Sequence, residues 1–153
     1  MTLTDMLKHT SPALFLPDLQ ATDKLSALEE MVSGLIAGTP ITNRETILKM
    51  LQSREQLGST AVGPGVAFPH GRTLAVQQLT VLIARSRSGV PFDSIDGGPT
   101  HLFFVLIAPP HDSGNQYIRS LAVLTENLQS VELRDRLMAA AGYEGFCQAL
   151  EEA

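Results

Sequence analysis

A histidine, an arginine and a glycine-rich turn lie together in residues 54–72 of the sequence. His70 stands between Pro69 and Gly71 after an apolar, extended segment. A proline without an N–H group at this point favours a strand terminus. Arg54 ends a helical pattern upstream, and a guanidinium group can bind two phosphate oxygens at once. This pairing of a presented imidazole with a nearby cation indicates a histidine that meets a phosphate group.

The turn between these two residues contains Gly58, Ser59 and Thr60. Gly58 can end the helix by adopting a positive φ, and the next two residues then offer hydroxyl and backbone N–H groups to an anion. We therefore predict that these three residues bind phosphate. A histidine at a strand end is also commonly a surface or hydrogen-bonded structural residue, and the residue types alone leave that interpretation open.

Two predicted helices precede the turn. The first begins at Thr22 or Asp23 and ends near Gly38, and the second begins at Thr42, with Glu45 placed to complete a capping box. The second helix delivers the arginine to the glycine-rich turn. Its inner side is expected to carry Ile47, Leu48, Met50, Leu51 and Leu57.

The segments that follow His70 have the composition of buried strands. Residues 79–85 and 102–108 are apolar, rich in β-branched or aromatic residues, and bounded by turn residues. A brief strand at residues 90–92 is possible between them. Both segments are therefore expected to be central strands, while His70 is expected at the terminus of the strand before them.

Three further helices are predicted near the C-terminus, at residues 116–128, 131–140 and 143–152. The buried side of the first of them is expected to carry Ile118, Leu121, Ala122, Leu124, Thr125 and Leu128. The N-terminus adds a helical turn and a short edge strand at residues 13–16, which two prolines bound. This order predicts one α/β domain over residues 1–153, with a mixed central β-sheet flanked by helices on both faces.

The composition of the chain indicates which binding partners and which cellular location to expect. The net charge is −5 and no Lys/Arg-rich cluster is present, so we expect no nucleic acid partner. The chain contains one cysteine, Cys147, and therefore no disulfide framework. The longest apolar run, residues 102–108, is far shorter than the roughly 18 residues that span a bilayer. No signal peptide is apparent, so we expect a cytoplasmic protein without direct membrane insertion.

The run R-E-Q-L-G-S-T-A-V-G-P-G-V-A-F-P-H-G resembles the active-site signature R-E-x-L-G-S-T-G-I-G-x-G-I-A-I-P-H of a known family. These are the enzyme IIA domains of the fructose/mannitol type in the bacterial phosphoenolpyruvate-dependent phosphotransferase system. The N-terminal segment is also similar, including Lys24 in the first turn of a long helix. The resemblance implies that His70 accepts a phosphoryl group from an HPr-like carrier protein, with Arg54 neutralising charge and no metal or organic cofactor required.

One position departs from the family pattern. A second active-site histidine usually begins the helix after the last strand, and the matching residue here is Tyr117. Its hydroxyl can donate to a phosphate oxygen or to a ring nitrogen of His70, but it is uncharged at neutral pH. His111, in the preceding loop, could take the place of the missing histidine, or it could be a solvated loop residue. The alternative function is therefore a phosphorylation-deficient binding module with the same fold.

If the protein is active, the family resemblance is compatible with two biological roles. The protein could be a separate sugar-transport subunit that passes the group to a IIB domain, or a nitrogen-regulatory IIA protein that controls target proteins. These 153 residues include no IIB or IIC domain, so we expect the regulatory branch. If active, the chain is a phosphotransferase component. A metal or hydrolytic site built from His70, His111 and Asp112 lacks recognised ligand spacing, so we expect no metal.

Overall fold

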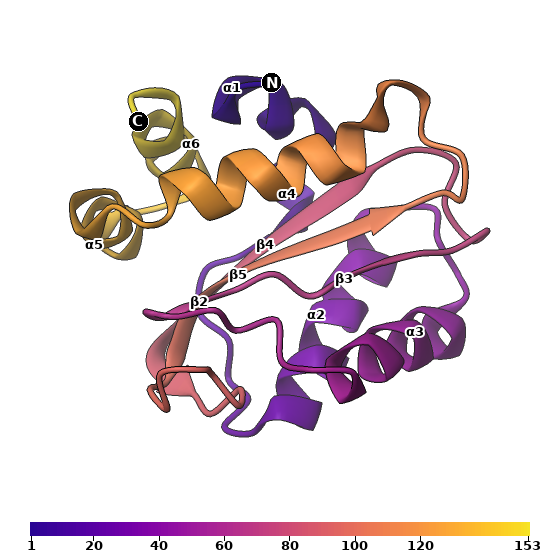
Figure 1. The fold of residues 1–153 in the computed structure, drawn as a ribbon, viewed down its shortest axis with the longest axis horizontal. Helices are drawn as coiled ribbons and strands as arrows, with labels where there is room; N and C mark the ends of the chain where they lie inside the picture. Colours follow the sequence, from indigo (N-terminus) through magenta and orange to yellow (C-terminus); the bar gives the residue numbers. More distant parts are fainter.

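A mixed five-stranded β-sheet runs through the centre of the computed structural model, which describes residues 1–153 (Figure 1). Its strands are β1 (Phe15–Leu16), β2 (Val66–Ala67), β3 (His70–Arg72), β4 (Thr80–Val90) and β5 (Thr100–Ala108). The order across the sheet is β1-β4-β5-β2, and β3 also pairs with β5. The β4–β5 pair is antiparallel and the other pairs are parallel. The predicted mixed sheet is therefore confirmed.

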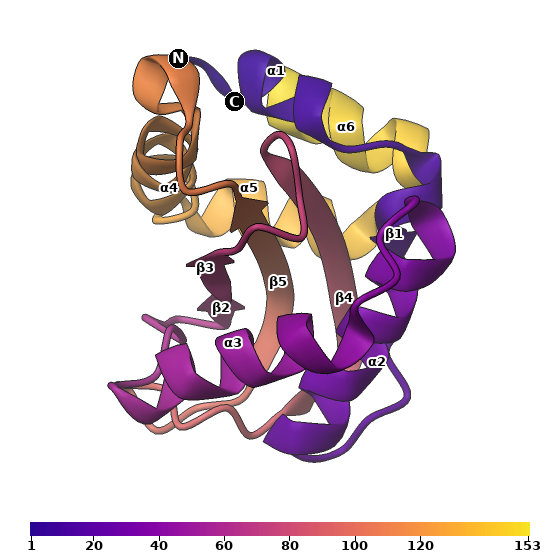
Figure 2. The ribbon, with the colours of Figure 1, turned by 90° about the vertical axis from the view of Figure 1, so that its right-hand side faces the viewer.

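Helices cover both faces of this sheet, as predicted (Figure 2). They are α1 (Leu3–Met6), α2 (Lys24–Gly38), α3 (Arg44–Gln56), α4 (Gln116–Asn127), α5 (Val131–Ala139) and α6 (Tyr143–Glu151). One face carries α2 and α3, and the other carries α1, α4, α5 and α6. None of the helices combines the length and the apolar sequence that a membrane crossing needs.

Alternate residues of the two long strands fill two separate apolar cores, because successive strand side chains point to opposite faces. Val81, Ile83 and Phe104 pack with the helices of the α4 face. Leu82 and Phe103 pack with α2 and α3. All five side chains are fully buried. Both faces are covered, which explains why these strands read as continuous apolar runs in the sequence.

The helix ends near the site agree only partly with the sequence predictions. Asp23 caps α2 as expected, and its carboxylate accepts the N–H of Ser26 at 2.9 Å. The capping box predicted from Thr42 and Glu45 is wrong, because α3 begins one residue later and its N-cap, Asn43, makes no side-chain cap bond. Leu57 was expected on the inner side of α3. It lies beyond the last helical residue and is 86% exposed.

The strand that carries the histidine differs from the predicted pattern. His70 is the first residue of β3, at a strand terminus as expected, and pairs with Leu106 of β5. The separate strand predicted at residues 90–92 is wrong, because Val90 is the last residue of β4 and pairs with Thr100. A His-Gly-Arg tripeptide has no apolar alternation, so only its pairing with β5 identifies β3 as a strand.

The buried stripe of α4 is rotated from the predicted one. Ile118 was expected inside but is 54% exposed, whereas Tyr117, Ser120 and Leu124 are buried. Ala122 and Thr125 of the predicted list are exposed as well. The buried residues follow the i, i+3, i+7 spacing of one helix face. This rotation turns the tyrosine toward the sheet.

A buried guanidinium ties three parts of the fold together. Arg85 of β4 is fully buried, and its Nε donates to the carbonyl oxygen of Pro17 at 3.0 Å. Its Nη1 donates to the carbonyl oxygens of Leu137 at 2.9 Å and Ala140 at 2.8 Å, at the end of α5. These carbonyls lack helical donors of their own, so the arginine caps α5 and anchors the chain that precedes α2.

Replacing Arg85 with methionine keeps most of the bulk but leaves these buried carbonyl groups without donors. We expect Arg85→Met to lower the free energy of unfolding by on the order of 3 kcal/mol, measured by urea denaturation. Arg87→Met, at an exposed position of the same strand, is the matched control and should change stability by less than about 0.5 kcal/mol. Equal stability of the two variants would contradict this role.

Candidate functional site

Two contacts hold the imidazole of His70. Its Nδ1 lies 2.6 Å from the carbonyl oxygen of Phe68. Its Nε2 lies 3.4 Å from Nε of Arg54, which donates to it. A carbonyl oxygen can only accept a hydrogen bond and the arginine can only donate one, so Nδ1 carries the proton and the unprotonated Nε2 accepts the bond from Arg54 with its electron pair. The site therefore places an unprotonated Nε2, which can act as a nucleophile, beside a fixed positive charge.

Close packing between α3 and β3 brings the arginine to the histidine. Arg54 lies in the last turn of α3 and also donates to the carbonyl oxygen of Gly58 at 2.8 Å. Met50, one turn earlier, packs against Gly71 of β3, where an added Cβ would meet its Sδ at 2.6 Å. The missing side chain at this glycine lets the helix lie against the strand.

Tyr117 reaches the site from the opposite layer of the fold. Its ring centroid is 5.9 Å from that of His70. The guanidinium carbon of Arg72 lies 4.6 Å from the centroid of the tyrosine ring, and Arg72 donates to the carbonyl oxygen of Pro109 at 3.1 Å. The backbone N–H of Tyr117 donates to Asp112 at 2.6 Å, which fixes the start of α4. The structure thus brings together Arg54, His70 and Tyr117, the three residues predicted as catalytic. Arg72, a second cation that directly follows His70-Gly71 in the sequence, lies beside them.

The glycine-rich turn is built largely from internal hydrogen bonds. Gly58 has a φ of +146°, in agreement with its expected positive value. The Ser59 hydroxyl donates to the carbonyl oxygen of Phe92 at 2.5 Å. The N–H and hydroxyl groups of Thr60 both donate to Glu55. The backbone N–H of Ser59 has no acceptor within the protein. The role of these turn residues in phosphate binding stays a prediction.

Burial sets the protonation of the two rings. Burial lowers the pKa of His70 from the usual 6.5, and the hydrogen bond to the Phe68 carbonyl partly offsets this shift. The charge of Arg54 lowers the pKa further, whereas the charge of Glu55 raises it. Burial also raises the pKa of the Tyr117 hydroxyl above its usual 10.0. The imidazole is therefore neutral and the phenol protonated near neutral pH, so one ring can attack while the other can donate a hydrogen bond.

The other histidine considered for the site lies apart from this cluster of contacts. His111 is exposed in the loop after β5 and makes neither a hydrogen bond nor a ring contact with His70. The neighbouring Asp112 is engaged by the first turn of α4. No three His, Cys, Asp or Glu side chains lie close enough to hold a metal ion.

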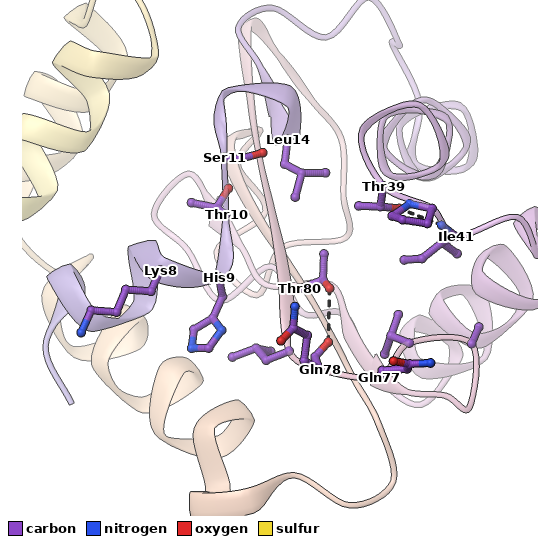
Figure 3. Close-up of a pocket in the computed structure, with 14 residues that line it drawn as sticks. Lys8, His9, Thr10, Ser11, Leu14, Thr39, Ile41, Gln77, Gln78 and Thr80 are labelled. Carbon is purple, nitrogen blue, oxygen red and sulfur yellow. Dashed lines mark hydrogen bonds between the residues drawn. The ribbon is translucent and has the colours of Figure 1, made fainter.

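A cavity of about 840 Å³ lies elsewhere on the molecule. It opens between the N-terminal segment, the α2–α3 connection and the β3–β4 loop, with Lys8 and His9 at one end and Thr39 and Ile41 at the other (Figure 3). None of the predicted site residues lines it. The chemistry proposed for His70 therefore does not use this cavity.

Comparison with known proteins assigns the family. The family model described as "Phosphoenolpyruvate-dependent sugar phosphotransferase system, EIIA 2" matches residues 8–153. The chain belongs to this family of enzyme IIA domains. The resemblance inferred from the active-site signature is thereby confirmed.

Similar proteins come from both branches of the family. A nitrogen regulatory protein of Bradyrhizobium diazoefficiens is 34% identical over 150 residues, which cover 98% of this chain and 95% of that protein. The crystal structure of nitrogen regulatory protein IIA-Ntr from Neisseria meningitidis has a TM-score of 0.87 and 29% identity, covering 95% of this chain and 98% of that one. The fructose-specific EIIABC component of Bacillus subtilis is 29% identical over 99% of this chain, which spans 23% of that longer protein.

The lowered pKa of His70 predicts its titration. Nuclear magnetic resonance of the ring should give a midpoint below 6.5, because burial disfavours the charged imidazole. The neutral form, which has the Nε2 electron pair, then persists as the pH falls and is lost only below that midpoint. Arg54→Gln should raise the midpoint by removing a nearby positive charge. Arg87→Gln, a change on an exposed part of β4, should leave it unchanged. A wild-type midpoint at or above 6.5 would argue against this account.

Proposed function

We propose that this IIA domain is a phosphohistidine carrier, in which Nε2 of His70 accepts a phosphoryl group from an HPr-like carrier protein. The observation that carries the proposal is the arrangement around the ring. Nδ1 directs its proton to the carbonyl oxygen of Phe68, and Nε2 faces Arg54. Nucleophilic attack on phosphorus requires a neutral imidazole with a fixed orientation and an unprotonated ring nitrogen.

The transfer step balances without a cofactor. A bond forms between Nε2 of His70 and phosphorus while the bond between phosphorus and the donor nitrogen breaks, and the electron pair of that bond stays on the donor. The Nδ1 proton remains on His70, bonded to the Phe68 carbonyl. Arg54 would neutralise the charge that the transition state spreads over the phosphoryl oxygens. The free N–H of Ser59 and the hydroxyl of Tyr117 are the further donors that the proposal assigns to these oxygens.

A protein, and not a small metabolite, is the donor that the surroundings of the site favour. Leu57, Leu74 and Ile95 are large apolar side chains that are almost fully exposed. Leu57 directly follows α3, which carries Arg54, and Leu74 follows β3, which carries His70. Ile95 lies in the loop between β4 and β5, and its N–H donates to the carbonyl oxygen of Ala61. Exposed large apolar side chains on the segments that form a functional site are typical of surfaces that dock another protein.

The nitrogen-regulatory branch is the better-supported context for this carrier. Two of the similar proteins are nitrogen regulatory proteins that match over nearly their whole length, one by sequence and one by fold. On this proposal the phosphorylation state of His70 controls binding to a target protein. In a sugar-transport context, the same group would instead pass to a IIB domain.

A phosphorylation-deficient binding module is the second candidate, and Tyr117 is the observation that favours it. The tyrosine lies against His70 where a relative would carry an ionisable imidazole, and it brings no positive charge. Arg72, stacked on the tyrosine ring, supplies a permanent cation next to it. This cation favours the active carrier over the inactive module.

The purified protein should gain one acid-labile phosphoryl group when incubated with phosphoenolpyruvate, enzyme I and an HPr-like carrier, as measured by intact mass. His70→Ala should abolish the gain, because the nucleophile is lost. Arg54→Ala should slow transfer by roughly two to three powers of ten, because a donor to the transition state is lost. His111→Ala and Lys49→Ala, at exposed positions on the α4 loop and on α3, are the matched controls and should behave like the wild type.

Two results would redirect the proposal. No mass gain with a folded protein and a carrier proven on another acceptor would favour the binding module. A normal transfer rate in Arg54→Ala would remove this arginine from the site.

A further inference from the structure

Glu55 is a buried carboxylate next to the site that the transfer step does not use. Its side chain is only 5% exposed, and it follows Arg54 in the last turn of α3. Carboxylates are seldom buried unless positive or hydrogen-bonding groups compensate for the lost water. Its charge must therefore have compensating partners nearby.

Three donors surround the two oxygens of this carboxylate. Oε1 lies 3.1 Å from Nζ of Lys24 and accepts the backbone N–H of Thr60, also at 3.1 Å. Oε2 accepts the hydroxyl of Thr60 at 2.5 Å. Hydrogen bonds to an ionised acceptor are about twice as strong as those between neutral groups. Glu55 thus binds the first turn of α2 and the glycine-rich turn at the same time.

The bonds continue from this turn to the imidazole. The carbonyl oxygen of Thr60 accepts the N–H of Phe68 at 3.1 Å. The carbonyl oxygen of Phe68 lies 2.6 Å from Nδ1 of His70. Thr60 and Phe68 are both buried, so water cannot easily replace either bond. A displacement of the threonine would therefore move the carbonyl group that orients the histidine.

Lys24 reinforces the same turn from another direction. Its Nζ lies 3.3 Å from the Asp93 carboxylate and 4.8 Å from the centroid of the Phe92 ring. The carbonyl oxygen of Phe92 accepts the Ser59 hydroxyl at 2.5 Å. The Asp93 side chain is largely exposed, so its pairing is weakened by solvent, whereas the pairing with the buried Glu55 is not.

We propose that Glu55 is a positioning residue for His70: held by Lys24, its carboxylate fixes Thr60 and, through Phe68, the orientation and tautomer of the imidazole. The expected effect of Glu55 on the rate of phosphoryl transfer rests on the proposed phosphocarrier function. The structural consequence does not, because the tautomer of His70 can be observed in the unphosphorylated protein.

The first test is nitrogen-15 nuclear magnetic resonance of the His70 ring at a pH where the ring is neutral. The wild type should show one tautomer, with the proton on Nδ1. Glu55→Ala and Thr60→Val should each give a mixture with the Nε2–H tautomer, because the Phe68 carbonyl is no longer held in place. Glu55→Gln should retain most of the wild-type tautomer, since its amide can still bond both Thr60 groups. Glu45→Ala, at an exposed position of the same helix, is the matched control.

The second test is the kinetics of phosphorylation by the carrier. Glu55→Ala and Thr60→Val should lower kcat by about 100-fold and leave KM for the carrier nearly unchanged, because the ring is misaligned while the docking surface is intact. Glu55→Gln should recover most of the loss. These kinetics separate a positioning residue from one that binds the partner, whose loss would raise KM.

Several results would overturn the proposal. An unchanged tautomer in both Glu55→Ala and Thr60→Val would show that the ring is oriented without them. A changed tautomer with an unchanged kcat would remove the kinetic role. If Glu55→Ala fails to fold, Thr60→Val still tests the proposal, since it only replaces one hydroxyl with a methyl group. If the wild type accepts no phosphoryl group, the phosphocarrier function fails and the tautomer experiment still tests the positioning role.

Discussion

The hydrogen bond from Nδ1 of His70 to the carbonyl oxygen of Phe68 is the contact on which the site depends. It assigns the proton to one nitrogen and leaves the electron pair on the other. Pro69 lies between the two residues, at the break between β2 and β3, and its carbonyl oxygen accepts a bond from Leu106 of β5. The sheet thereby holds His70, which pairs with Leu106, and the proline that precedes it.

The position of β3 between the two helical layers explains how distant side chains reach one imidazole (Figure 1). Arg54 comes from α3, which covers one face of the sheet, and Tyr117 comes from α4 on the other. Each layer has its own apolar core, so each side chain rests on an independently packed support. Such support keeps a site precise, because catalytic groups must be held to a fraction of an ångström.

Local sequence signals predicted the residues within one continuous motif, and the family resemblance predicted that the distant Tyr117 meets His70. The packing of α4 and the partners of Glu55 were not predicted. Arg54, Gly58 and His70 lie close along the chain, so helix end, turn and strand could be inferred from their order. The rotation that buries Tyr117 and exposes Ile118 could not, because aliphatic residues occur on several sides of α4 and only packing on the sheet selects one. In the sequence, Glu55 is indistinguishable from an exposed helical carboxylate, because its partner Lys24 comes from another helix.

The most direct measurement is the identity of the phosphorylated nitrogen. Nitrogen-15 and phosphorus-31 nuclear magnetic resonance of the phosphorylated protein can assign the phosphorus–nitrogen bond to one position of the His70 ring. The geometry predicts attachment to Nε2, with the proton retained on Nδ1 and bonded to the Phe68 carbonyl. Attachment to Nδ1, or to a residue other than His70, would contradict the account.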